Sequence, residues 1–132
     1  MNFDAQAIFA NLTEKERVQG HHSAEGQAIR TLSRALNGWS SGNLAGADVV
    51  AMCDQAIEDW LKARLKLSPW SAIAIADLLA EAVAKNLLTP MDGDRLQRLH
   101  DLRAGSTEDA IAAADVEAVL ERSIQIVEKH WS

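Results

Sequence analysis

The stretch Asp94-Arg-Leu-Gln-Arg-Leu-His-Asp-Leu-Arg-Ala-Gly-Ser-Thr-Glu108, together with the run Asp115–Trp131, carries the clearest indication of the fold. At 100° per residue, three leucines of the first stretch share one helix face: Leu96, Leu99 and Leu102. Arg95 and Arg103 lie four residues either side of Leu99 on that same face. A charged side chain among leucines needs a carboxylate or backbone partner, or must reach water. Arg103 is therefore either a structural ion-pair partner or a site residue.

The same apolar spacing predicts helices along the rest of the chain: Asp4–Leu12, Thr13–Asn37, Ala47–Leu67, Ser71–Leu87, Pro90–Ala104 and Asp115–Trp131. The pattern Thr13-Glu-Lys-Glu16 is that of a capping box. Gly20 and Gly26 weaken the helix that would follow it, so either that helix begins at Ser23 or the glycines allow a close helix crossing. No stretch alternates as a strand does. The sequence therefore predicts an all-α, up-and-down bundle of five to six helices.

The segment Ser71–Leu87 is unusually apolar, with only Asp77, Glu81 and Lys85 on its polar strip. Such a helix is either central in the bundle or shared with a second subunit. Ile73 falls in line with the polar strip, beside Trp70 at the proline break. Trp70 and Ile73 are therefore the predicted interface between two copies of the chain.

Length and composition indicate one domain of 132 residues, with residues 1–45 as an N-terminal helical segment and 46–132 as the core. Nineteen acidic against thirteen basic residues give a net charge of −6, which argues against a broad nucleic-acid-binding surface. Cys53 is the only cysteine, so we expect a reduced thiol in the core. No signal peptide and no membrane-spanning stretch is predicted, which favours a cytoplasmic protein.

From Cys53 onward the order of parts resembles the HEPN domain family. The helix Ala56–Leu67 is followed by a break, a second apolar helix, Asn86-Leu-Leu-Thr-Pro90, and Arg95–Arg103 with its Leu-x-x-Leu-Arg signature. A loop and an amphipathic terminal helix complete the pattern. The resemblance implies a HEPN-like bundle for residues 46–132, whereas residues 1–45 rest only on the general expectation of another bundle helix.

Catalytic members of that family are metal-independent ribonucleases that use an arginine and a histidine four to six positions after it, usually across a dimer. The histidine exchanges a proton with the reacting oxygens and the arginine stabilises the phosphate charge. Here the corresponding arginine is Arg103, but Ala104 follows it and no histidine occurs between His100 and His130. The resemblance therefore implies a degenerate motif, with Arg103 and His100 as the only weak catalytic candidates.

Two other arrangements of residues have the spacing of functional motifs. Arg95 and His100 have the bare family spacing but point to different helix faces, so the match is accidental. His21 and Glu25 are spaced as metal ligands often are, yet nothing nearby supplies a third ligand. No metal and no cofactor is predicted.

The basic cluster of the quoted stretch is the candidate binding surface: Arg95, Arg98 and Arg103. These arginines could bind a phosphate or an acidic partner. The alternative is pairing with the nearby carboxylates of Asp92, Asp94, Asp101 or Glu108.

The sequence thus predicts a non-catalytic, HEPN-like homodimer that serves in protein–protein interaction or ligand sensing, with a protein partner possible and RNA or a nucleotide not favoured. The alternative is a divergent metal-independent ribonuclease of toxin type that uses Arg103 with His100. A third hypothesis is a purely structural bundle whose only product is an oligomer. Whether the chain is an enzyme stays open, although the missing histidine favours a protein without enzymatic activity.

Overall fold

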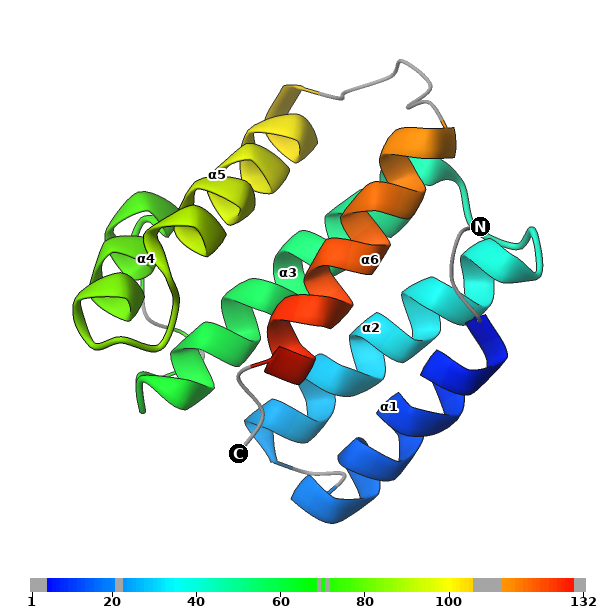
Figure 1. Cartoon of the computed structure of the whole chain (residues 1–132), viewed down its shortest axis with the longest axis horizontal. Coiled ribbons are helices and arrows are strands. Elements are labelled where there is room, and N and C mark those ends of the chain that lie inside the picture. Colours follow the sequence, from blue (N-terminus) through cyan, green and yellow to red (C-terminus); the bar gives the residue numbers. More distant parts are fainter. Residues whose placement is uncertain (1–4, 21–22, 69, 71, 106–112, 130–132) are drawn as a thin grey trace.

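The computed structural model describes residues 5–20, 23–68, 70, 72–105 and 113–129. Its six helices pack together in one bundle (Figure 1): α1 (Ala5–Gln19), α2 (Ala24–Ser40), α3 (Gly46–Arg64), α4 (Ile75–Ala84), α5 (Pro90–Gly105) and α6 (Ala113–Lys129). Every regular element within these residues is an α-helix. The predicted all-α bundle is confirmed.

The centre of the bundle is α3, which packs against α2, α4, α5 and α6 (Figure 1). Its buried stripe has the predicted helical spacing: Val49, Val50, Cys53, Ala56, Ile57, Trp60 and Leu61. The Trp60 side chain is only 1% exposed, and the Arg64 guanidinium lies over its ring, 5.9 Å from the centroid. Burial of this stripe stabilises the fold, since each large apolar side chain contributes roughly 1.5–3 kcal/mol.

The junction between α1 and α2 corrects the predicted capping box. Helix α1 runs through Thr13 to Gln19, and α2 begins after Ser23, whose Oγ accepts a hydrogen bond of 2.9 Å from the Gly26 N–H. Instead of capping, the Glu16 carboxylate pairs with Arg30 of α2 at 2.8 Å. The capping box does not form because α1 continues through Thr13 and buries Leu12 and Glu16 against α2. A helix break at Thr13 would prevent this burial.

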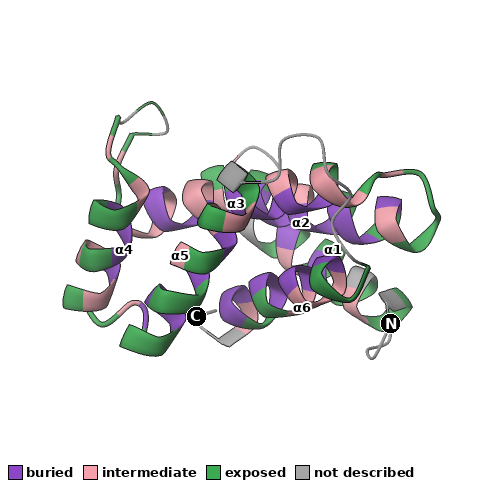
Figure 2. Ribbon diagram, turned by 90° about the horizontal axis from the view of Figure 1, so that it is seen from above, coloured by how far each residue is buried: buried purple, intermediate pink, exposed green. Residues whose placement is uncertain are grey.

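Helix α4 lies at the edge of the bundle beside α5 (Figures 1 and 2), so of the two predicted alternatives the central position is excluded, and a contact with a second subunit stays a prediction. It is also shorter than predicted. Ile73 precedes the first helical residue, Ile75, so the helical register that placed Ile73 beside Asp77 does not apply. The helix ends where Asn86 takes the left-handed conformation (φ 61°) and Leu87 N–H donates back to the Ala82 carbonyl at 2.9 Å.

The start of α5 agrees with the prediction. Pro90 is its first residue, and the Thr89 hydroxyl accepts a hydrogen bond of 3.1 Å from the Asp92 N–H. Both α5 and α6 rest on α3, which lies beneath them (Figure 1). None of the helices in the described residues combines the length and the apolarity that a membrane crossing requires.

Candidate functional site

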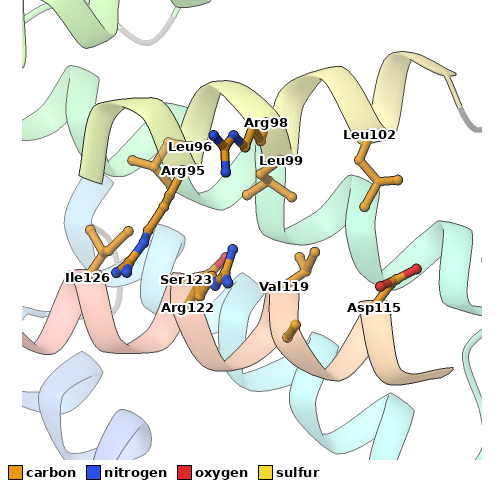
Figure 3. Close-up of a pocket in the computed structure, with 11 residues that line it drawn as sticks. Arg95, Leu96, Arg98, Leu99, Leu102, Asp115, Val119, Arg122, Ser123 and Ile126 are labelled. Atoms are coloured by element: carbon orange, nitrogen blue, oxygen red, sulfur yellow. The ribbon is translucent and has the colours of Figure 1, made fainter. Parts of the chain in front are cut away.

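A groove of about 310 Å³ separates α5 from α6 (Figure 3). The two helices touch each other little, because α5 packs on α3 and α4 and α6 packs mainly on α3, and the space left between them is the groove. Its lining comes from both helices: Arg95, Leu96, Arg98, Leu99, Leu102, Asp115, Ala118, Val119, Arg122, Ser123 and Ile126. The volume lies at the lower end of the range of about 300–1,000 Å³ typical of small-molecule sites.

The floor of the groove is apolar and rigid. It is formed by side chains that also belong to the core of the bundle, each less than a tenth exposed: Leu96, Leu99, Val119 and Ile126. The leucines of α5 are the face predicted from the quoted stretch. Because these residues are fixed by packing beneath them, the floor is formed before any ligand arrives.

Three arginines form the rim: Arg95 and Arg98 from α5, and Arg122 from α6. All three are exposed, and within the described part of the chain none of their side chains forms an ion pair or a hydrogen bond. Figure 3 shows Arg95 reaching across the gap toward Ile126 of α6, with Arg122 beneath Arg98. Three uncompensated positive charges beside an apolar floor are suited to an anion that carries apolar surface.

The positive rim continues into a small adjoining cavity of about 80 Å³. Arg95, Arg122 and Ile126 line both spaces, and the small cavity adds Asp92 and Gln125. The groove thus has one end with two arginines and a nearby carboxylate. At its other end lie Leu102 and Asp115 (Figure 3).

Arg122 was missed by sequence reasoning, although a signal was present. On α6, Asp115, Val119, Arg122 and Ile126 are spaced by four, three and four residues and therefore share one helix face. An arginine on the same face as two core residues repeats the pattern that singled out Arg103. What the spacing could not show is that this face lies opposite α5.

Arg103 lies elsewhere. Its Nη1 donates to Asp54 Oδ2 of α3 at 2.9 Å, and His100 Nδ1 lies 3.1 Å from the same oxygen. The structure therefore brings Arg95 and Arg98 of the predicted binding set together in the groove and places Arg103 on a carboxylate instead. Asp54 is distant from Arg103 in sequence and is not one of the nearby carboxylates that the sequence suggested; of those, Glu108 lies outside the described residues.

The Asp54 cluster is a buried carboxylate held by two half-exposed donors. The side chain of Asp54 is 6% exposed, against 37% for His100 and 40% for Arg103. A carboxylate oxygen only accepts hydrogen bonds, so His100 Nδ1 must carry the proton in this contact. The cluster joins α5 to α3. The cluster also holds a histidine and an arginine on one carboxylate, and a histidine paired with a carboxylate is an arrangement used for proton transfer.

The two residues predicted as an interface differ in their surroundings. Trp70 is 89% exposed, the most exposed large apolar side chain among the described residues. Ile73 is half-buried and packs against the core. Of the two predicted residues, Trp70 is therefore the one that offers extensive apolar surface to a second chain.

Cys53 is buried between α3 and α6, where burial raises the pKa of its thiol to about 12 and the Ser123 hydroxyl beside it acts in the opposite direction. The thiol is therefore protonated and unreactive at neutral pH, as predicted for a core-filling cysteine. Among the described residues no group of three metal-ligating side chains is close enough to hold an ion. Of the pair with metal-ligand spacing, His21 and Glu25, His21 lies outside the described residues.

Comparison of the chain with protein-family models, with curated proteins and with solved structures gave no match. The candidate site therefore rests on its own geometry.

Proposed function

We propose that this protein is a non-catalytic, HEPN-like binding module that senses an anionic small molecule in the groove between α5 and α6. The observation that carries the proposal is the set of three unpaired arginines above an apolar floor. On a chain of net charge −6, such a cluster is a local attraction for anions and not part of a general basic surface. A concave pocket favours a small ligand over the flat surface of a protein partner.

The position of Arg103 supports the absence of catalysis. An arginine that stabilises a phosphate must be free to meet it, whereas Arg103 donates to the buried Asp54 carboxylate at 2.9 Å. The family-type histidine after Arg103 is also absent from the sequence. Neither Arg103 nor His100 lines the groove.

Anion binding in the groove is tested by titration with benzenesulfonate, an anion that carries one charged group and has about the size of the groove. Binding is followed through the chemical shifts of the backbone amides in NMR spectra. We expect shifts confined to α5 and α6. The Arg122→Ala variant should weaken binding, whereas Arg34→Ala, which removes an exposed arginine of α2 outside the groove, should not. Neutral benzenesulfonamide should bind more weakly than the sulfonate. Shifts spread over the whole surface, or equal binding by both compounds, would contradict the proposal.

The second candidate function is metal-independent RNA cleavage, favoured by the Asp54–His100–Arg103 cluster. It is tested with a single-stranded RNA in the presence of a chelator. We expect no cleavage that depends on the cluster. Cleavage by the unaltered protein that is lost in both His100→Ala and Arg103→Ala would establish an enzyme, while cleavage that persists in both would indicate a contaminant.

We further propose that the module acts as a homodimer, with Trp70 at the contact. The support is a tryptophan that is 89% exposed at the edge of the bundle, next to the apolar helix α4. The test is the mass in solution of the unaltered protein. A dimer is expected, and a monomer at all concentrations would refute this part of the proposal.

A further inference from the structure

The groove changes in character along its length. Arg95 and Arg122 mark one end, where the small cavity adjoins, and Leu99 and Val119 line the middle (Figure 3). A ligand that satisfies both parts must carry its charge at one end and apolar surface along the rest. Because a guanidinium fork binds a carboxylate through two parallel hydrogen bonds, a carboxylate fits the arginine end.

The size and shape of the groove indicate a short, linear ligand. The lining leucines of α5 extend from Leu96 to Leu102, which at 1.5 Å per residue is about 9 Å of helix. The groove volume of about 310 Å³ lies at the lower end of the range of small-molecule sites, so it suits a small ligand. An extended octanoate ion has about the length of this leucine face.

Two carboxylates limit the charge that the ligand can carry. Asp115 lies at the apolar end of the groove, and Asp92 lines the small cavity at the arginine end. A second negative charge at the far end of the ligand would meet Asp115, and a doubly charged head would lie near Asp92. Because like charges repel, a ligand with one negative charge is favoured over a dianion.

We infer that the ligand is a linear medium-chain monocarboxylate, an inference that rests on the proposed function of the groove. Its carboxylate lies between Arg95 and Arg122, and its alkyl chain lies over Leu99 and Val119 toward Asp115. Arg98 covers the middle of the groove from the rim. The orientation is set by charge at both ends, because arginine attracts the head and Asp115 rejects it.

The test is a set of calorimetric or NMR titrations of the full chain with octanoate, octan-1-ol and octanedioate. Octanoate should bind at least roughly tenfold more tightly than the other two, since the alcohol lacks the charge and the diacid brings a second one. From butanoate to octanoate the affinity should rise about fourfold per methylene, as expected for burial of each CH₂ group.

Substitutions at the arginine end and at the Asp115 end of the groove test the contribution of each end to binding. Arg122→Ala should weaken octanoate binding roughly tenfold or more, with Arg122→Lys in between because it keeps the charge but loses the fork. Arg34→Ala is the matched control and should leave affinity unchanged. Asp115→Asn should improve octanedioate binding, because the second carboxylate of the diacid no longer meets a like charge, so the difference in affinity between octanoate and octanedioate should shrink. All of the substituted residues are exposed, and circular dichroism verifies that each variant is folded.

The outcomes distinguish this inference from the proposed function. If benzenesulfonate binds in the groove and octanoate does not, the ligand class is wrong while the anion-binding groove stands. If neither binds, both proposals fail. If Arg122→Ala converts a dimer to a monomer and octanoate does not bind, a second copy of the chain covers the groove and the inference is overturned.

Discussion

Replacement of Asp54 by Asn should destabilise the protein by about 2 kcal/mol, because Asp54 is the buried acceptor that holds α5 on α3. A hydrogen bond to a charged group contributes about 1.5–3 kcal/mol when it is well shielded. Here the two donors, His100 and Arg103, are 37% and 40% exposed, so solvent screens each contact. Discounted for this screening, each contact contributes about 1 kcal/mol, and the two together give the total.

The assay is urea unfolding followed by circular dichroism, with the free energy of unfolding obtained by linear extrapolation. The matched control is Asp59→Asn on the same helix. Asp59 accepts a hydrogen bond of 3.0 Å from Gln55 at the surface, and its replacement should change the free energy by no more than about 0.5 kcal/mol.

A double-mutant cycle isolates the contact between Asp54 and Arg103. Arg103→Gln removes the guanidinium, and the coupling energy with Asp54→Asn should be about 1 kcal/mol. If the two substitutions were additive, or if Asp54→Asn behaved like the Asp59 control, the cluster would contribute no stability and the structural role given to Arg103 would be refuted.

Three other residues, Cys53, Gly26 and Trp70, lead to further predictions. Cys53 should not react with a thiol reagent at pH 8 until the protein is unfolded in denaturant, because burial raises the pKa of its thiol to about 12. Fast reaction of the native protein would contradict this prediction by showing that the thiol is accessible. Since the unfolded thiol ionises from its ordinary value of 9.0 while the buried one stays protonated, the free energy of unfolding should also fall as the pH rises above 9, and Cys53→Ala should reduce that slope. Gly26→Ala should destabilise the protein despite the better helix propensity of alanine, by about 1 kcal/mol or more in urea unfolding, since the added Cβ would collide with the Gly20 carbonyl oxygen; a more stable variant would contradict the close approach. Trp70→Ser should leave the free energy of unfolding within about 0.5 kcal/mol and convert the proposed dimer to a monomer in a measurement of mass, whereas an unchanged dimer would exclude Trp70 from the contact.

Local sequence predicted most helices because their signals are local. The start of α5 at Pro90 follows from the fixed backbone of proline and the capping hydroxyl of Thr89. The start of α2 after Ser23 was one of two alternatives that the sequence left open. The capping box at Thr13 failed because burial of α1 against α2 outweighs a cap of about 1 kcal/mol.

The sequence by itself determined the helical class of the fold, the leucine face of α5 and the buried, inert Cys53, since these follow from helical periodicity and side-chain chemistry. Only the tertiary structure decided which charges act together. It placed Arg122 of α6 opposite Arg95 and set Asp54 of α3 against Arg103. Helical spacing shows which residues share a face of one helix. Which face of another helix lies opposite depends on packing across the whole bundle.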